Sequence, residues 1–426
     1  MKTLLFSLLA ASAASAQPDP APRPLTLPEA QAIALKNHPA VSAALLNALA
    51  AGQVTAEVRS AYFPTLTASV TAAGAADGSR IAAGALNNPI IYNRIASGFT
   101  VSQLLTDFGR TANLTESAKL RAKAQQDNAQ TTRAQVLLQV DRAYFAALRA
   151  EKVLEVARQP VSARQVVADL VAALARSKLK SGLDVSFANV NLSEAKLLLV
   201  GAENDREAAA AELAAALGYS DRRNFSLADA APPAADPGDL PALLAGALRD
   251  RPELASIRAE QSAAERFVKA ERALQYPTVG ALASAGVIPG HEDTLRGRYG
   301  ALGFNVNIPV LNGHLFAARR GEAEYRAQAV AQNARELENR VARDVHIAWL
   351  NANTAFRRLT LTAELLAEAT QALDLAQTRY DYGLGNIVEL SMAQLNVTSA
   401  QIADASALYD YQTQRILVDY QTGALH

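Results

Sequence analysis

The chain has 426 residues, of which 41 are basic and 41 acidic, so its formal net charge is zero. A neutral chain gives no electrostatic reason to expect nucleic-acid binding. It has no cysteine, which excludes a disulfide framework, a thiol catalyst and a lipid-modified cysteine. The five histidines are scattered, and the sequence shows no motif that combines a catalytic nucleophile with a general base. We therefore expect no metal site, no cofactor and no enzymatic activity.

The first 16 residues have the pattern of a secretory signal peptide. Lys2 precedes a short apolar run, and small residues lead to a cleavage site after Ala16. The run is too short to span a bilayer. Beyond it no run of 18 apolar residues follows, so we expect no transmembrane helix. That criterion detects helices only, because the strands of a membrane β-barrel alternate and form no apolar run.

The rest of the chain is a duplication. Three prolines, Pro28, Pro39 and Pro64, recur as Pro241, Pro252 and Pro277. The separation is constant, since 241 − 28, 252 − 39 and 277 − 64 all give 213. At the far end Gly218 matches Gly423, and 423 − 218 gives 205. A period of this size is far longer than a solenoid repeat. We therefore expect two complete structural repeats, 17–238 and 239–426.

Each repeat has the same order of expected elements. An alanine-rich helix at 40–62 is followed by strands near 65–75 and 95–106 and then by a very long helix near 110–180. The second repeat has strands near 277–288 and 298–309 and a long helix near 313–382. Each long helix would measure roughly 100 Å at about 1.5 Å per residue. The fold class is mainly α with a small β part, and helices this long need neighbours to bury them.

The four strands indicate a membrane barrel shared between chains. They alternate apolar and polar residues, as strands with one wet face do; a small sheet in a soluble domain is the alternative. Four strands cannot close a membrane barrel, since the smallest have about eight, and lipid does not tolerate open sheet edges. Three chains would supply about twelve strands, which predicts a homotrimer.

Several motifs, duplicated in register, resemble the TolC-type outer-membrane factor family. They are Leu-Thr-Leu-Pro-Glu-Ala at 25–30, Asn-His-Pro at 37–39, Tyr-Phe-Pro at 62–64 and Tyr-Asp-Tyr-Gly at 380–383. The resemblance implies duplicated helical hairpins that form a periplasmic α-barrel below a 12-stranded trimeric β-barrel in the outer membrane of a Gram-negative bacterium. It implies a passive exit duct of a tripartite efflux pump or a type I secretion system. Its partners would be a periplasmic adaptor and an inner-membrane transporter. A periplasmic coiled-coil adaptor or scaffold is the alternative.

The turns that follow the long helices are the candidate functional site. Each has a glycine suited to a left-handed helix cap, and we align Gly182 with Gly383. This alignment gives 383 − 182 = 201, whereas Ala195 and Ala400 give 400 − 195 = 205. The first turn is therefore predicted to be four residues shorter, so that the two tips differ.

The resemblance also assigns roles near these turns. Acidic rings and tyrosine contacts close the tunnel in that family, and the matching positions here are Asp184, Tyr380 and Glu389. Helix capping is the alternative for both carboxylates.

Four further residues at the turns would contact the adaptor, with ordinary turn residues as the alternative: Gly182, Leu183, Gly383 and Leu384. The chain departs from the family pattern at Gly385, where some members have a basic residue, and at Met392, where some have an acidic one. The gate is then either looser or tied from Arg379 or Arg176.

Overall fold

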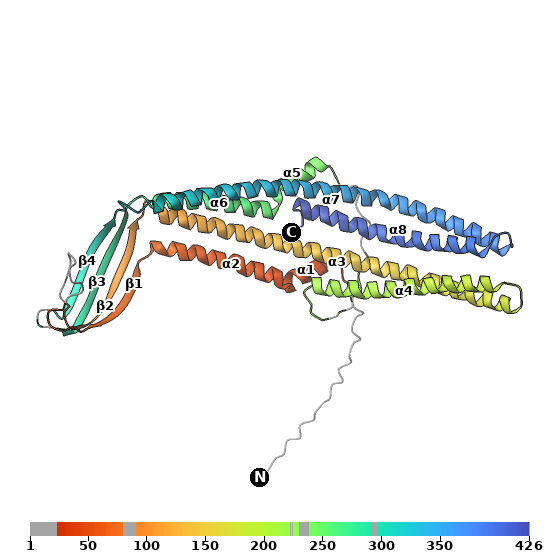
Figure 1. Ribbon diagram of the computed structural model, residues 1–426, viewed down its shortest axis with the longest axis horizontal. Coiled ribbons are helices and arrows are strands. Elements are labelled where there is room, and N and C mark those ends of the chain that lie inside the picture. The colour runs from red at the N-terminus through yellow and green to blue at the C-terminus, as the bar shows by residue number, and fades with distance from the viewer. Residues whose placement is uncertain are drawn as a thin grey trace, which may run out of the picture. The chain divides into compact units, whose positions relative to one another are not determined.

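The structure is a computed structural model that describes residues 24–79, 91–221, 223, 225–229, 238–291, 293 and 296–425. The predicted signal peptide, 1–16, lies outside these residues. The described chain is mainly helical with one four-stranded sheet, which confirms the predicted fold class (Figure 1).

The chain forms two compact units, and each draws on both halves of the sequence. The tip unit comprises Met1–Asn37, Val140–Ala234 and Thr362–Tyr409. The sheet unit comprises His38–Gln139, Ala235–Leu361 and Asp410–His426. Three helices run from one unit into the other: α3 (Arg110–Arg176), α7 (Leu315–Asp381) and α8 (Ile387–Thr422).

The remaining elements belong to one unit each. The tip unit contains α1 (Leu27–Asn37) and α4 (Gly182–Ala216). The sheet unit contains α2 (Pro39–Arg59), the 3-10 turn η1 (Ser60–Tyr62), β1 (Thr65–Ala73), β2 (Arg94–Thr106), α5 (Leu240–Asp250), α6 (Pro252–Ala273), β3 (Thr278–His291) and β4 (Arg298–Asn307).

The sheet is antiparallel in the order β1-β2-β3-β4 and has two chemically different faces. Rows of register partners share a face because side chains alternate along a strand. One face is dominated by Thr65, Thr67, Ser69, Thr71, Thr100, Ser102, Ser284, Asn305 and Asn307. The other contains Leu66, Val70, Phe99, Val101, Leu302, Phe304 and Val306. All of these apolar residues except Val101 are exposed in the single chain.

A tyrosine fills a notch between two glycines on this sheet. Gly98 pairs with Gly286, and Gly286 pairs with Tyr299. A Cβ atom on Gly98 would lie 2.2 Å from Tyr299 Oη, and one on Gly286 would lie 2.6 Å from its ring. Because glycine has no side chain at either position, the Tyr299 ring lies against the backbone of β2 and β3.

Alanine dominates the buried positions of the helices, and small side chains let helices approach closely. In the sheet unit Ser117 Oγ of α3 donates to the carbonyl of Ala263 in α6 at 2.8 Å. Ser256 Oγ of α6 donates to the carbonyl of Ala124 at 3.0 Å. Each bond joins a side chain to the backbone of the neighbouring helix, so the two bonds tie α3 and α6 together.

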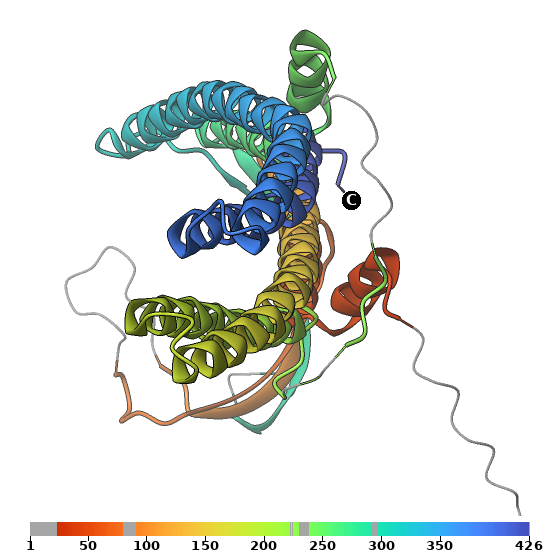
Figure 2. The same cartoon turned by 90° about the vertical axis from the view of Figure 1, so that its right-hand side faces the viewer.

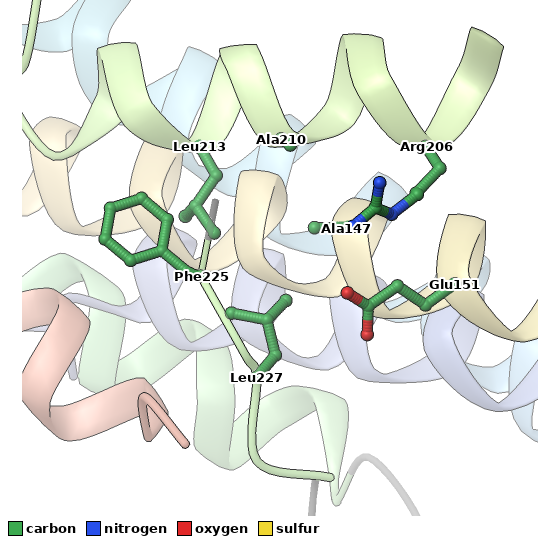
Figure 3. Close-up of a pocket in the computed structure, with 7 residues that line it drawn as sticks. All are labelled: Ala147, Glu151, Arg206, Ala210, Leu213, Phe225 and Leu227. Carbon is green, nitrogen blue, oxygen red and sulfur yellow. The ribbon is translucent and has the colours of Figure 1, made fainter. Parts of the chain in front are cut away.

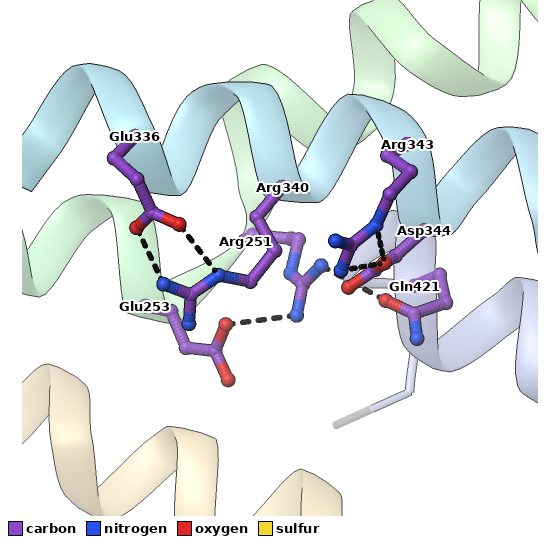
Figure 4. Close-up of polar contacts among 7 residues, drawn as sticks. All are labelled: Arg251, Glu253, Glu336, Arg340, Arg343, Asp344 and Gln421. Carbon is purple, nitrogen blue, oxygen red and sulfur yellow. Dashed lines mark hydrogen bonds and ion pairs between the residues drawn. The ribbon is translucent and has the colours of Figure 1, made fainter.

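A buried arginine links the bend between α5 and α6 to the end of α8 (Figure 4). Arg251 precedes Pro252, which restricts it to the extended conformation observed there. Its guanidinium donates to Glu253 Oε2 at 2.8 Å and to Gln421 Oε1 at 2.9 Å. Its side chain is only 7% exposed, so losing Glu253 would leave a buried charge without this counter-charge.

One described segment, Pro39–Tyr62, is long and apolar enough to cross a membrane by length and composition alone. The expectation of no transmembrane helix, made from the sequence, did not single out this segment. It required an uninterrupted apolar run, whereas α2 intersperses Ser42, Asn47 and Gln53 among alanines and leucines. Only 6% of the apolar window is buried within the chain, which leaves a largely uncovered apolar helix beside the sheet.

Candidate functional site

The candidate site lies at the tips of two helical hairpins in the tip unit, α3 with α4 and α7 with α8. Figure 2 looks onto these tips and shows the two hairpins as separate pairs of helices. The long helices end at Arg176 and Asp381, and 381 − 176 gives 205. The return helices begin at Gly182 and Ile387, and 387 − 182 also gives 205.

Both long helices end in the same hydrogen-bond pattern. In the first hairpin Leu179 N donates to Leu174 O at 2.9 Å, and Lys178 N donates to Ala175 O at 3.0 Å. In the second, Leu384 N donates to Arg379 O at 2.7 Å and Gly383 N to Tyr380 O at 3.1 Å. These are paired bonds of the Schellman type, which close a helix on a left-handed residue.

The predicted difference between the tips is therefore wrong. Lys178 has φ 60° and takes the left-handed position that Gly383 takes with φ 72°, and 383 − 178 gives 205. Gly182 is instead the first residue of α4. The alignment failed because it assumed a glycine at the left-handed position, where the first hairpin has a lysine. The two turns have equal length.

Asp184 is part of a capping box at the start of α4. Its backbone N–H donates to Ser181 Oγ at 3.2 Å, and its Oδ2 accepts from Ser181 N at 2.9 Å and from Ser181 Oγ at 2.8 Å. The bond from the Ser181 backbone and the bond from its hydroxyl hold the pKa of Asp184 below its ordinary value of 3.8. This carboxylate therefore stays charged at neutral pH and stabilises the N-terminus of α4.

Glu389 holds the equivalent position in α8 but has a different partner. Its backbone N–H donates to Asn386 Oδ1 at 2.8 Å, so Asn386 caps α8 as Ser181 caps α4. Its side chain forms an ion pair with Arg379, at 3.0 Å between Nε and Oε1. Arg379 is one of the two basic residues considered from sequence. The pair is half exposed, which limits it to roughly 0–1 kcal/mol.

Tyr380 connects the two hairpins. Lys180 Nζ, in the turn of the first hairpin, lies 4.5 Å from the centroid of the Tyr380 ring, in the second. Both residues are partly buried. A cation–π contact of this kind contributes about 0.5–1 kcal/mol at an exposed site. Sequence reasoning missed Lys180 because it looked for the basic residue after the glycine of the second turn, where Gly385 stands.

A second contact joins the hairpins further from the turns. Asn191 Nδ2 of α4 donates to Ser391 Oγ of α8 at 2.6 Å. Ser391 Oγ in turn donates to the carbonyl of Ile387 at 2.7 Å. The buried Arg164 of α3 donates to the carbonyl of Asn191 at 2.9 Å. The hairpins are therefore tied at two levels, and the tie at Asn191 extends into α3.

The four residues predicted to contact an adaptor all lie at the exposed end of the tip unit. Leu183 is 65% exposed and Leu384 is 73% exposed, and both glycines are exposed beside them. The structure adds Leu179, which is 70% exposed and is the counterpart of Leu384, since 384 − 179 gives 205. The constant offset of 205 between the two turns was the signal that would have identified Leu179.

The tip unit also contains a small pocket away from the turns (Figure 3). It is lined by Ala147, Glu151, Arg206, Ala210, Leu213, Phe225 and Leu227. Its volume of about 10 Å³ is room for at most one water. Burial raises the pKa of Glu151. Among the described residues, no three or more His, Cys, Asp or Glu side chains gather as they do around a metal ion.

The two-faced sheet and the paired helical hairpins define the class of outer-membrane channel proteins that extend into the periplasm. The sequence matches the outer membrane efflux protein family over residues 32–219 and 243–423. The chain therefore belongs to this family, which confirms the resemblance drawn from the duplicated motifs. It is an outer-membrane efflux channel protein rather than a coiled-coil adaptor or scaffold.

The sequence identity between this chain and individual proteins is low. It is 25% identical over 321 residues to the outer membrane efflux protein BepC of Brucella suis, covering 74% of this chain and 68% of BepC. It is 22% identical over 350 residues to the outer membrane protein TolC of Salmonella enteritidis, covering 80% of this chain and 71% of TolC. The crystal structure of VceC from Vibrio cholerae matches with a TM-score of 0.79 at 18% identity, covering 93% of this chain and 96% of VceC.

Proposed function

We propose that three copies of this chain form the passive exit duct of a tripartite efflux pump or a type I secretion system. Two repeats, 17–238 and 239–426, each supply two strands and one long hairpin. The trimer crosses the outer membrane as a 12-stranded barrel and continues into the periplasm as a helical tunnel. An inner-membrane transporter supplies the energy, and a periplasmic adaptor joins it to the duct.

The observation that carries this proposal is the two-faced sheet with its open edges. Its apolar face suits lipid and its Thr, Ser and Asn face suits a water-filled lumen. Within the described residues, β1 and β4 each pair with one strand only, and open edges are not tolerated in lipid. A second copy that pairs its β4 with this β1 covers that edge, and a third copy pairs with the two edges that remain and closes the barrel. The uncovered apolar side of α2 calls for the same partner.

The gate in this proposal lies at the hairpin tips. Tyr380 holds the two hairpins of one chain together through Lys180, and Glu389 is held by Arg379. Asp184 and Glu389 from three chains place six carboxylates around the tunnel entrance. Because Arg379 balances Glu389, it is mainly Asp184 whose charge favours cations there. Gly182, Leu183, Gly383 and Leu384, with Leu179, form the surface that meets the adaptor.

The oligomer and the duct are tested on the purified protein. We expect the chain in the outer-membrane fraction, a trimer by light scattering in detergent, and discrete conductance steps in planar bilayers. Recovery as a soluble monomer from the periplasm would contradict the proposal.

The adaptor surface has its own test. A photo-crosslinking amino acid at Leu384 should capture a co-expressed periplasmic adaptor, and the same group at Val306, on the lipid-facing side of β4, should not. Equal capture at both positions, or none at Leu384, would remove the assignment of this surface.

A further inference from the structure

The return helices α4 and α8 have the same short pattern of polar residues. Ser186 and Asn191 in α4 correspond to Ser391 and Asn396 in α8, because 391 − 186 and 396 − 191 both give 205. The helix boundaries and both turns follow the same offset. The correspondence is therefore structural as well as sequential.

Each helix presents its serine and its asparagine to different sides. The two are five positions apart, and at about 100° per residue their side chains point roughly 140° apart around the helix. One helix can therefore contact one neighbour through its asparagine and another through its serine. Among the described residues of α4 and α8 one such contact is present, between Asn191 of α4 and Ser391 of α8.

The two remaining members of the pattern are exposed. Asn191 and Ser391 are partly buried against each other, whereas Ser186 and Asn396 are exposed in the single chain. The operation that carries α4 onto α8 carries Asn191 onto Asn396. If the same operation is applied once more, it places α4 of a second copy against α8 of the first copy. Ser186 of the second copy then faces Asn396 of the first. Head-to-tail contacts of this kind close into a ring when the rotation fits, and six hairpins require about 60° per step.

We propose that Asn396 of one chain donates a hydrogen bond to Ser186 of the next chain, repeating across the subunit boundary the contact between Asn191 and Ser391. This proposal rests on the trimer proposed above and assigns a residue pair to its periplasmic boundary. The occupant is a second copy of this chain, because the complementary serine is part of the same repeat.

The boundary between chains differs from the contact within a chain at the tip. Lys180 corresponds to Gly385 and Tyr380 to Ala175, since 385 − 180 and 380 − 175 both give 205. Neither glycine nor alanine can form a cation–π contact. The contact between Lys180 and Tyr380 therefore has no equivalent between chains, and the asparagine–serine pair is the repeated tie at this end.

Cysteine pairs test the proposal directly, because the natural chain has no cysteine. The full-length protein is purified in detergent, its oligomeric state is measured by light scattering, and a short bifunctional thiol crosslinker is added. Ser186→Cys with Asn396→Cys should convert the monomer band into covalent dimer and trimer on a denaturing gel. Asn191→Cys with Ser391→Cys should crosslink within the chain and leave the mass of the monomer unchanged.

Two controls define the background. Each single cysteine variant should remain a monomer on the gel. Asn191→Cys with Asn396→Cys places both thiols on the asparagine sides, so it should give no covalent dimer beyond the single variants. A trimer in which the Ser186/Asn396 pair gives no more covalent dimer than the single variants overturns this inference and leaves the duct intact. A monomer before crosslinking instead overturns the proposed trimer.

Discussion

Asp184 accepts both bonds from Ser181 through a single carboxylate oxygen, Oδ2. Capping α4 and contributing charge at the tunnel entrance are therefore compatible roles for one residue. Glu389 differs, because its charge is already balanced by Arg379 at 3.0 Å. The two acidic positions, which correspond to each other in the two repeats, thus have different electrostatic surroundings.

The Asp184→Asn substitution separates capping from charge. We expect it to weaken the start of α4 by about 0.5–1 kcal/mol at neutral pH. Because the folded-state pKa is lowered, the stabilisation is present above the ordinary value of 3.8 and is lost as pH falls through the lowered pKa. Hydrogen exchange of the tip amides should therefore differ between variant and natural protein at pH 7 and converge in acid. A difference that persists unchanged in acid would exclude the titrating cap.

The sheet unit contains a buried ion pair whose carboxylate is Glu271. Glu271 of α6 is 2% exposed and receives two bonds from Arg319 of α7, at 2.8 and 3.1 Å. Arg319→Ala leaves that charge buried, and we expect a loss of about 2–3 kcal/mol because Arg319 itself is 43% exposed. The measurement is the dissociation temperature of the proposed trimer. Adding Glu271→Gln should recover part of the loss, and no recovery would show that the arginine acts through packing alone.

Sequence patterns predicted the helices and strands better than they predicted the contacts at the candidate site. Alternation located the four strands. The structure adds a cap at the turn between β2 and α3, where Thr111 N donates to Asp107 Oδ2 at 2.6 Å. The tip turns were misaligned because a lysine can take a left-handed conformation at a cost that no local pattern reveals. Contacts between hairpins, such as Lys180 with Tyr380, depend on tertiary packing and could not be predicted from the sequence.

Two glycine substitutions test the corrected alignment. Gly383 has φ 72°, so Gly383→Ala should destabilise the second turn by roughly 1–2 kcal/mol. Gly182 begins a helix and a Cβ there meets nothing within 4 Å, so Gly182→Ala should be neutral or stabilising by up to about 1 kcal/mol. Hydrogen exchange at each turn measures the local opening. Equal destabilisation at both would restore the original alignment of Gly182 with Gly383.

The notch in the sheet gives a further prediction at this scale. Gly98→Ala would place a Cβ 2.2 Å from Tyr299 Oη and 2.7 Å from the carbonyl of Ala285. We expect this overpacking to cost about 1–3 kcal/mol, measured in detergent as a lower temperature for dissociation of the proposed trimer. Tyr299→Ala should restore part of it, since the backbone contact remains. The matched control is Gly303→Ala, where a Cβ meets nothing within 4 Å.

At the scale of the whole molecule, the duplication produces an uneven ring. In the proposed trimer the cation–π contact occurs three times within chains and is missing at the three boundaries between them. Each contact contributes about 0.5–1 kcal/mol, so no single one holds a tunnel shut. Three acting together contribute roughly 1.5–3 kcal/mol, which shifts a closed-to-open equilibrium about ten- to 150-fold.

Tyr380→Leu tests this sum. It removes all three contacts from a trimer, and we expect the open fraction of channels in planar bilayers to rise about ten- to 150-fold when opening is concerted. Tyr380→Phe keeps the ring that Lys180 faces, so it should gate like the natural protein, and Lys180→Gln should reproduce the effect of Tyr380→Leu. If phenylalanine opens the channel as much as leucine does, the hydroxyl rather than the ring face holds the hairpins. The boundaries between chains have no such contact to lose, so Tyr380→Leu leaves them unchanged. We therefore expect opening to remain partial while Asn396 and Ser186 stay paired.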